Sequence, residues 1–353
     1  MNGGDRSLYA GTYTSRESEG IYRLAFNSET GTAGKPVLAA RTANPSFVLP
    51  KPGGQLLYAV NELWEFGGRP GGGVTAFAAG ADGTLEVIGS ECTHGADPCH
   101  LAFDSTGQFL LVSNFTGGSL CVLPVRDDGS LEQASDVVEH QGQGHHPRRQ
   151  SQPHVHSVAV SPGGLVIAAD LGIDRLVVYR LDTDRGSLAR VNECATAPGA
   201  GPRHMAFSED GRVLFVSNEL DSTITSYSWD EATGGLARLS AVAAATVRAE
   251  ENSPAHLLMH PGGCWLFASN RRHDSIATFA RDADGGLERV STALSGGRKP
   301  RGFAIDPGGR WLVAANQDTD SLVFFAINED TGELTRQGEP LRVPSPVWVA
   351  FSA

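Results

Sequence analysis

Short apolar runs rich in β-forming residues alternate along the chain with turns that contain glycine. Residues 201–220, GPRHMAFSEDGRVLFVSNEL, show the pattern most clearly, because two such runs flank the turn Ser208–Gly211. This pattern predicts a β-hairpin. Since a hairpin returns the chain to its starting side, Arg203 and His204 at the entry are predicted to lie beside Glu219 at the exit.

The same hairpin recurs along the whole sequence. Six full copies begin at Pro45, Pro98, Pro153, Pro202, Pro254 and Pro300. A half-copy, PVWVAF from Pro346, lacks its second strand, which is found at the other end of the chain as LYAGTYT from Leu8. Successive prolines are 46 to 55 residues apart, and the fourth repeat carries two more strand-like runs, Thr223–Trp229 and Ala237–Ala245. Four strands per repeat predict an all-β, seven-bladed β-propeller over residues 1–353 as a single domain. Pairing of the N- and C-terminal strands is expected to close the ring.

Two positions of each repeat are predicted to form rings around the mouth of the central channel. The strand-entry positions read Phe47, His100, His156, His204, His256, Gly302 and Trp348. The strand-exit positions read Asn61, Asn114, Asp170, Asn218, Asn270, Asn316 and, from the wrapped copy, Thr12. We expect the recurring asparagine to hydrogen-bond within the bend that follows its strand. The recurring histidines are explained by a repeated hydrogen bond as well as by catalysis. In the third repeat the turn proline is shifted by one residue relative to the other copies.

Residues that break the repeat point to chemistry more directly, because the fold does not require them. His154 has no counterpart in the other repeats. Arg203 and Arg301 stand where small or apolar residues occupy the other copies, and Glu219 and Arg271, like Glu62, follow an exit asparagine. Guanidiniums and carboxylates gathered beside an imidazole suit an anionic ligand and acid–base chemistry.

The overall charge limits the possible partners. A formal net charge of -12 argues against a nucleic-acid or membrane partner, so the positive charge for an anionic ligand has to come from local residues. The start of the chain has no signal-peptide pattern, and we expect a cytoplasmic protein that is a monomer or a weak homodimer. Five cysteines without CxxC spacing indicate reduced, buried thiols.

The segment HQGQGHHPRRQSQPHVH, residues 140–156, concentrates five histidines and two arginines and is predicted to form a loop over the same mouth. His154 and His156 with Asp170 or Glu219 form a conceivable metal-ligand set. The ligands would have to come from different blades, so the prediction is that no metal and no other cofactor is bound. Phosphate-loop, dinucleotide and nucleophile-elbow motifs are absent from the sequence.

The sequence resembles the seven-bladed lactonases typified by bacterial cytoplasmic 6-phosphogluconolactonase, a family that includes a fungal 3-carboxy-cis,cis-muconate lactonizing enzyme. The motifs that carry the resemblance include RRQSQPHVHSVAV, GPRHMAFSEDGRVLFVSNELDSTITSY and FASNRRHDSIATF, and they span nearly the whole chain in order. One departure is Arg272, where related sequences often have a small residue.

The resemblance implies a cleft at the channel mouth with catalytic residues His154 or His156, Arg203, Glu219 and Arg271. In the implied mechanism the arginines bind an anionic group and stabilise an oxyanion. A histidine acts as general base, and Glu219 orients it or carries a proton to the leaving alkoxide. Further residues expected to bind the small anionic substrate are Glu62, His100, Arg149, His204, His256, Arg301 and Asn316.

The leading functional prediction is hydrolysis of a sugar-acid lactone such as 6-phosphogluconolactone. A cyclase, lyase or isomerase that acts on an unsaturated carboxylate or a secondary metabolite is an alternative with the same residues. A non-catalytic ligand-binding propeller and a metal-dependent gluconolactonase-type propeller are further alternatives.

Overall fold

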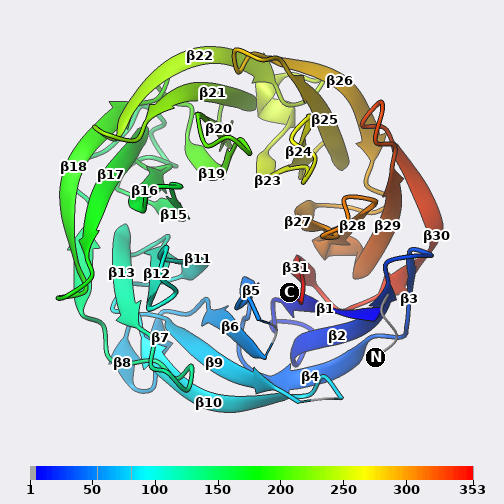
Figure 1. Cartoon of the computed structure of the whole chain (residues 1–353), viewed down its shortest axis with the longest axis horizontal. Coiled ribbons are helices and arrows are strands. Elements are labelled where there is room, and N and C mark those ends of the chain that lie inside the picture. The colour runs from blue at the N-terminus through cyan, green and yellow to red at the C-terminus, as the bar shows by residue number, and fades with distance from the viewer. Residues whose placement is uncertain (1–4, 54, 81, 353) are drawn as a thin grey trace.

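The computed structural model describes residues 5–53, 55–80 and 82–352. In this part of the chain, seven antiparallel β-sheets stand side by side around one central axis (Figure 1). Each sheet contributes four strands in consecutive hydrogen-bonded order, and the sheet that contains β1 also pairs the short strand β3 (Thr32–Ala33). The predicted all-β, seven-bladed propeller is confirmed.

The strands occupy the same place in every blade. The innermost strands are β5 (Val48–Pro50), β11 (Pro98–Phe103), β15 (Val155–Val160), β19 (Pro202–Phe207), β23 (Pro254–Met259), β27 (Pro300–Ile305) and β31 (Pro346–Phe351). The second strands are β1 (Asp5–Thr12), β6 (Leu56–Asn61), β12 (Phe109–Asn114), β16 (Leu165–Asp170), β20 (Val213–Asn218), β24 (Trp265–Asn270) and β28 (Trp311–Asn316). The third strands are β2 (Gly20–Asn27), β9 (Gly73–Ala79), β13 (Ser119–Pro124), β17 (Arg175–Asp182), β21 (Thr223–Asp230), β25 (Ser275–Arg281) and β29 (Ser321–Ile327). The outer strands are β4 (Val37–Arg41), β10 (Leu85–Cys92), β14 (Asp136–Glu139), β18 (Ser187–Ala195), β22 (Gly235–Ala243), β26 (Leu287–Leu294) and β30 (Leu334–Arg342).

The two ends of the chain close the ring in one blade. The first strand, β1, pairs antiparallel with β31, with Leu8 opposite Phe351 and Ala10 opposite Val349. Figure 1 shows this junction as blue strands beside a red one. The closure predicted from the half-copies at the two termini is confirmed, and it gives β31 a paired neighbour within its blade as every other innermost strand has.

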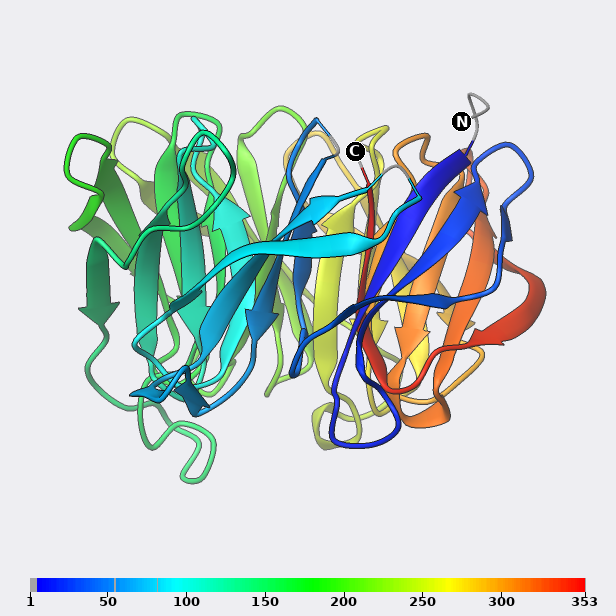
Figure 2. The same cartoon turned by 90° about the horizontal axis from the view of Figure 1, so that it is seen from below.

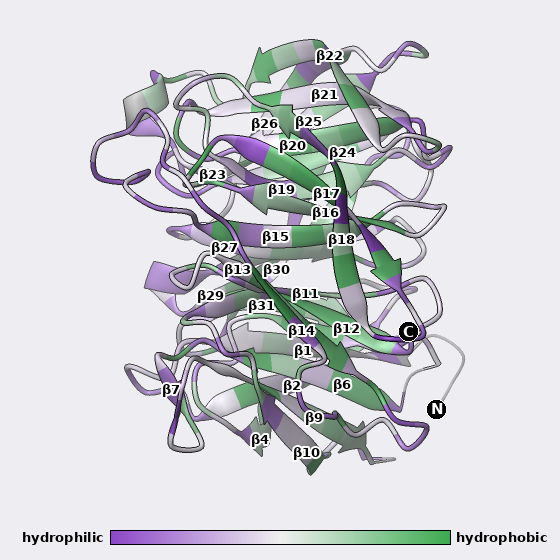
Figure 3. Cartoon of the chain, turned by 90° about the vertical axis from the view of Figure 1, so that its left-hand side faces the viewer, coloured by the Kyte–Doolittle hydropathy of each residue, from purple (hydrophilic) through white to green (hydrophobic). Residues whose placement is uncertain are grey.

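The hydrophobic core lies between neighbouring blades. Every residue of β12 and of β20 is buried, whereas the outer strand β26 alternates between half-buried and exposed residues. One core cluster joins Ile167 and Val178 of one blade to Leu214 and Tyr227 of the next. Figure 3 shows the same division, with hydrophobic colour along the strands and hydrophilic colour in the loops. Because each blade buries its faces against two neighbours, the ring fixes the position of every inner strand.

A register shift in the innermost strands decides which side chains reach the channel. In β19 the pairing passes from Pro202 opposite Asn218 to His204 opposite Ser217, so that Arg203 is left over as a bulge residue. In β15 the pairing passes from Val155 opposite Asp170 to Ser157 opposite Ala169. His156 therefore takes the place of Arg203 in its blade, and Ser157 takes the place of His204.

This alignment corrects the predicted register of the third repeat, in which His156 was matched to the entry histidines. The reason is the turn between the two inner strands, which runs from Val160 to Leu165 in this blade and from Phe207 to Val213 in the blade of Arg203. The turn is one residue shorter, so counting back from the strand exit assigns His156 to the wrong position.

The long loops gather at the lower edge of the ring in Figure 2, on the side where the second strands end. They include the small hairpin β7 (Glu65–Phe66) and β8 (Arg69–Pro70) and the 3-10 turns η1 (Ala249–Glu251) and η2 (Gln317–Thr319). No helix within the described ranges is long and apolar enough to cross a membrane.

Candidate active site at the channel mouth

A layer of aromatic and imidazole side chains from or beside the innermost strands fills the channel, deeper inside the ring than its mouth on the loop side. The Trp348 ring lies 4.1 Å from the Phe47 ring and 4.2 Å from the His256 ring, measured between centroids. His204 lies 5.2 Å from both His100 and His256. A glycine at residue 302 makes room for the tryptophan, since a Cβ there would lie 2.9 Å from the Trp348 ring. A ligand can therefore reach the inner strands from the loop side.

Two of the recurring histidines of this layer, His100 and His256, hold neighbouring blades together. Nδ1 of His100 accepts the backbone N–H of Val158 at 3.5 Å, and Nδ1 of His256 accepts that of Phe303 at 3.4 Å. Burial lowers the pKa of His100 to about 3 and holds the pKa of His204 and of His256 well below the usual value. These imidazoles are neutral at physiological pH, and the repeated hydrogen bond favours a structural role.

Above this layer, Glu219 lies at the centre of three arginines. Its Oε2 is 3.0 Å from Nε of Arg203 and 2.7 Å from Nη2 of Arg271, and its Oε1 is 2.6 Å from Nη2 of Arg149. The sequence placed Arg203 and Glu219 on one hairpin, and the loop after β24 and the long histidine-rich segment supply the other two arginines. The fold thus brings together four of the predicted site residues.

The charges around Glu219 decide its protonation state. Burial alone would raise the pKa of this carboxyl, but Arg271, Arg203 and Arg149 outweigh burial and hold the pKa well below its usual range. Glu219 is therefore an anion at physiological pH and orders the arginines. This favours an orienting role for Glu219 over the delivery of protons.

One N–H group of the Arg203 guanidinium has no hydrogen-bond partner among the described residues. Its side chain is 2% exposed, its Nε is bound to Glu219, and its Nη1 is buried without a hydrogen-bond partner in the described part of the chain. A buried donor without a partner costs free energy, and such groups cluster where a ligand supplies the missing acceptor. The guanidinium is thus preorganised for an anionic atom.

A cationic pocket of about 380 Å³ opens beside Glu219. Its lining is made of Arg149, Glu219, Ser253, Arg271, Arg272, Asp274, Arg298, Lys299 and Asp318. Five of these side chains are cationic and three are acidic, and Nζ of Lys299 lies 3.8 Å from Oδ1 of Asp318. Although the protein as a whole is acidic, this pocket therefore favours an anion.

A second carboxylate of the mouth, Glu62, lies in a cluster with Tyr13, Ser46 and Arg301, and the cluster draws its residues from the blades of β1, β6 and β27. The Tyr13 hydroxyl donates to Glu62 Oε1 at 2.9 Å and to Oε2 at 3.0 Å, and the Ser46 hydroxyl donates to Oε2. The Arg301 guanidinium lies over the Tyr13 ring, 5.5 Å from its centroid. Burial raises the pKa of Glu62 more than Arg301, Ser46 and Tyr13 lower it.

A small cavity of about 10 Å³ is lined both by Glu62 and by Arg203, the ion-pair partner of Glu219. It is lined by Ser46, Phe47, Glu62, Cys99, His156, Arg203, His204, Arg301, Val347 and Trp348. A cavity of this size has room for about one water molecule. Glu62 and Arg203, far apart in sequence, thus face one shared space.

The two histidines proposed as general base are in different environments. His154 stacks on Phe115 at 4.5 Å, and its Nδ1 donates to the Phe115 carbonyl at 3.0 Å, so Nε2 of the neutral ring is the acceptor. His156 is 4% exposed and lines the small cavity. Burial and the positive charge of Arg203 hold the pKa of His156 well below its usual value.

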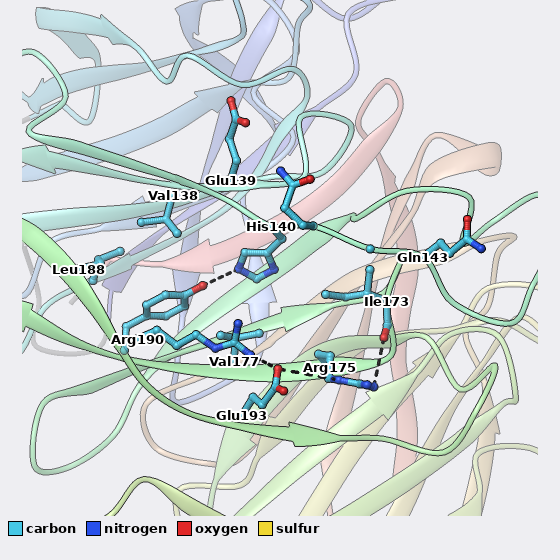
Figure 4. Close-up of a pocket in the computed structure, with 13 residues that line it drawn as sticks. Val138, Glu139, His140, Gln143, Ile173, Arg175, Val177, Leu188, Arg190 and Glu193 are labelled. Carbon is cyan, nitrogen blue, oxygen red and sulfur yellow. Dashed lines mark hydrogen bonds and ion pairs between the residues drawn. The ribbon is translucent and has the colours of Figure 1, made fainter.

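The start of the histidine-rich segment forms a different structure on the outer side of the ring. His140 follows the short strand β14 and faces a pocket of about 520 Å³ between β14, β17 and β18 (Figure 4). Its Nε2 accepts the Tyr179 hydroxyl at 2.7 Å, and its Nδ1 lies 2.7 Å from Oδ2 of Asp170. The other oxygen of Asp170 accepts the backbone N–H of His154 at 2.7 Å. His140 and Asp170 therefore fix where the segment re-enters the mouth.

These hydrogen bonds and ion pairs occupy the carboxylates that would have to coordinate a metal ion at the mouth. Asp170 is engaged by His140 and by backbone amides, and Glu219 faces three guanidiniums. Among the described residues, no group of three or more histidine, cysteine, aspartate or glutamate side chains is arranged to hold a metal ion.

The exit asparagines stabilise the links between blades. The side-chain amides of Asn61, Asn114, Asn270 and Asn316 donate to carbonyls of the incoming crossover. Those of Asn114, Asn218 and Asn270 also donate to the hydroxyls of Ser119, Thr223 and Ser275, so the hydrogen bond predicted within the bend is present in these three blades. Asn316 is fully buried, which favours a structural role over the substrate contact predicted for it.

Sequence reasoning missed several residues of the site. Arg298 and Lys299 precede an inner strand and resemble ordinary loop charges. Tyr13, in contrast, carried a readable signal, since it follows Thr12 at the exit of the wrapped hairpin and so matches Glu62 and Glu219 in their blades.

Comparison with known proteins agrees with this architecture. The family described as "Lactonase, 7-bladed beta-propeller" matches residues 7–351. The 6-phosphogluconolactonase of Bacillus subtilis is 35% identical over 350 residues, which is 97% of each chain. A putative 6-phosphogluconolactonase from Bacteroides fragilis superposes with a TM-score of 0.92 at 35% identity over 99% of each chain. The periplasmic gluconolactonase of Pseudomonas aeruginosa also gives a TM-score of 0.92, at 34% identity over 99% of each chain. Because relatives of this kind include a periplasmic protein, the cytoplasmic location stays a prediction. The chain belongs to the seven-bladed β-propeller lactonase family.

Proposed function

We propose that this protein hydrolyses a phosphorylated sugar-acid lactone, of which 6-phosphogluconolactone is the leading candidate, to the open-chain acid. The observation that carries the proposal is the cationic pocket beside Glu219, whose volume of about 380 Å³ falls within the range of small-molecule sites. The names of the relatives from Bacillus subtilis and Bacteroides fragilis support the same substrate class.

The binding mode follows from the distribution of charge. The phosphate lies in the cationic pocket, where Arg271, Arg298 and Lys299 can donate charge-assisted hydrogen bonds. The lactone ring then extends toward the channel axis, where Arg203 links the cationic pocket to the small cavity through its ion pair with Glu219.

Arg203 supplies the stabilisation of the transition state. When water attacks the lactone carbonyl, negative charge develops on the carbonyl oxygen, and Nη1 of Arg203 can donate to it. Because this donor is buried and already oriented by Glu219, it needs no reorganisation at the moment of reaction. Arg203 thus contributes more to the transition state than to the neutral ground state.

The test is a coupled assay with freshly generated 6-phosphogluconolactone, in which a dehydrogenase reports 6-phosphogluconate and the spontaneous rate is subtracted. The protein is expected to accelerate hydrolysis, and Arg203→Ala is expected to lower kcat/KM about 100-fold, the usual scale for loss of one oxyanion donor. No acceleration by folded protein would contradict the proposal and would favour a cyclase or isomerase that acts on an unsaturated carboxylate. Unchanged kinetics in Arg203→Ala would remove this arginine from the mechanism.

A further inference from the structure

The carboxylates of Glu219, which is buried, and of Glu62, which is half-buried, are held in opposite electrostatic environments at the channel mouth. Glu219 is surrounded by three guanidiniums, which keep its pKa low. Glu62 has hydrogen bonds from Tyr13 and Ser46, and burial dominates its pKa, which is raised. When the environments of two carboxyl groups shift their pKa values in opposite directions, the two groups commonly take different roles in catalysis. One stays charged, and the other exchanges protons.

The geometry around Glu62 places it beside the space for a water molecule. Glu62, His156 and Arg203 line the same cavity, which has room for about one water. Arg203 also lines this cavity, and its Nη1 is buried with no hydrogen-bond partner among the described residues. A water between them can donate to the carboxylate while the guanidinium awaits the carbonyl oxygen of the lactone.

His156 and His154 are weaker choices for the base. The imidazole of His156 is buried among positive charges, so its affinity for a proton is much reduced. His154 lies on the rim against Phe115 and is not part of the lining of the small cavity. Of these three groups, Glu62 is the one that lines the cavity and has a strengthened affinity for protons.

We propose that Glu62 is the general base of lactone opening and that it acts on a single water held between Glu62 and Arg203 in the channel cavity. This inference rests on the proposed hydrolytic function. The water oxygen forms a bond to the carbonyl carbon, and one water proton passes to a carboxylate oxygen of Glu62. The bond between the carbonyl carbon and the ring oxygen then breaks, and the leaving alkoxide takes the proton back from Glu62. The product is the hydroxy acid, and Glu62 is again a carboxylate.

The surroundings of Glu62 set the pH dependence. The titratable and charged groups that act on Glu62 or share its cavity are Tyr13, Asp97, Cys99, His156, Arg203, His204 and Arg301. The ionised carboxylate is the active form, so kcat/KM is expected to rise with pH through the pKa of Glu62 and to level off above it. Since the Tyr13 hydrogen bond lowers the pKa of Glu62, Tyr13→Phe is expected to move this rise to higher pH.

The experiment measures kcat/KM against pH for the wild type, Glu62→Gln, Tyr13→Phe and His156→Gln, with melting curves for each. Glu62→Gln is expected to lower kcat/KM by about 100-fold to 10,000-fold, the range for loss of a general base. His156→Gln is expected to retain the acid limb of the profile. Glu65→Gln, an exposed carboxylate on the same loop, is the matched control and is expected to behave as the wild type.

Each outcome decides the proposal. Folded Glu62→Gln with wild-type kcat/KM overturns it, and so does loss of the acid limb in His156→Gln with retention in Glu62→Gln. If Glu62→Gln does not fold, Tyr13→Phe decides, because a structural role for Glu62 does not move the limb. Inactive, folded wild-type protein overturns the proposed function itself, which distinguishes that failure from failure of the assignment to Glu62.

Discussion

Glu219 is predicted to be a main electrostatic support of the channel mouth, and Glu219→Gln tests this by removing its charge while keeping its shape. The side chains of Glu219 and Arg203 are 5% and 2% exposed, and that of Arg271 is 12% exposed. Removing one partner of a buried ion pair leaves an uncompensated charge and costs about 3–5 kcal/mol. We therefore expect Glu219→Gln to lower the free energy of unfolding by about that amount.

The expected shift of the melting temperature follows from the size of the protein. An unfolding entropy of about 2.1 cal/mol/K per residue over 353 residues gives about 0.7 kcal/mol/K, so the loss corresponds to about 4–7 °C in Tm. Calorimetry at pH 7 measures this shift. The direction in which stability changes with pH also follows from the pKa of Glu219. The depressed pKa of Glu219 adds stability above about pH 4 that is lost in more acidic solution, and Glu219→Gln lacks that loss.

Two variants control for other effects of the substitution. The Arg149 side chain is 41% exposed, so Arg149→Gln breaks an ion pair with the same carboxylate at a cost of less than about 1 kcal/mol. The double variant Glu219→Gln with Arg203→Met is expected to recover part of the stability, because it leaves one fewer buried charge unpaired. A Tm of Glu219→Gln within about 1 °C of the wild type, or an equal loss in Arg149→Gln, would refute the reasoning.

Three further predictions concern substrate binding, pH and metals. Lys299→Gln is expected to raise KM for the phosphorylated lactone about tenfold, the effect of losing one charge-assisted hydrogen bond, and to leave KM for the unphosphorylated lactone unchanged in the same assay. An equal effect on both lactones would place the phosphate elsewhere. His100 has a pKa of about 3 in the folded state, so stability is expected to fall with acidification below about pH 6.5. Urea unfolding of His100→Gln between pH 7 and pH 5 should show an average slope smaller by about 1 kcal/mol per pH unit, and an unchanged slope would rule out this linkage. EDTA is expected to leave the lactonase rate unchanged, and inactivation that zinc or calcium reverses would contradict the metal-free mechanism.

The fold could be read from the sequence because its period is carried by every copy. Proline before the inner strand, asparagine at the exit of the second and glycine in the turn between them fixed the strands to within a few residues. The predicted register of β15 was wrong because the turn between Val160 and Leu165 is one residue shorter than the turn in the blade of Arg203, and the count back from the strand exit assumed a turn of equal length.

The candidate site was only partly predictable. Arg203, Glu219 and Arg271 stood out because they break the repeat. The relation between Glu62 and Glu219 could not be read, because it depends on which charges surround each carboxylate after seven blades close. Arg298 and Lys299 gave no periodic signal, and only the crossover into β27 brings them to the cationic pocket.

A crystal structure with bound 6-phosphogluconate tests the location of the active site most directly. The account predicts the phosphate among Arg271, Arg298 and Lys299, with the carboxylate of the product directed toward Arg203. Product bound instead in the outer pocket beside His140, or turned so that its phosphate lies at Arg203, would contradict it.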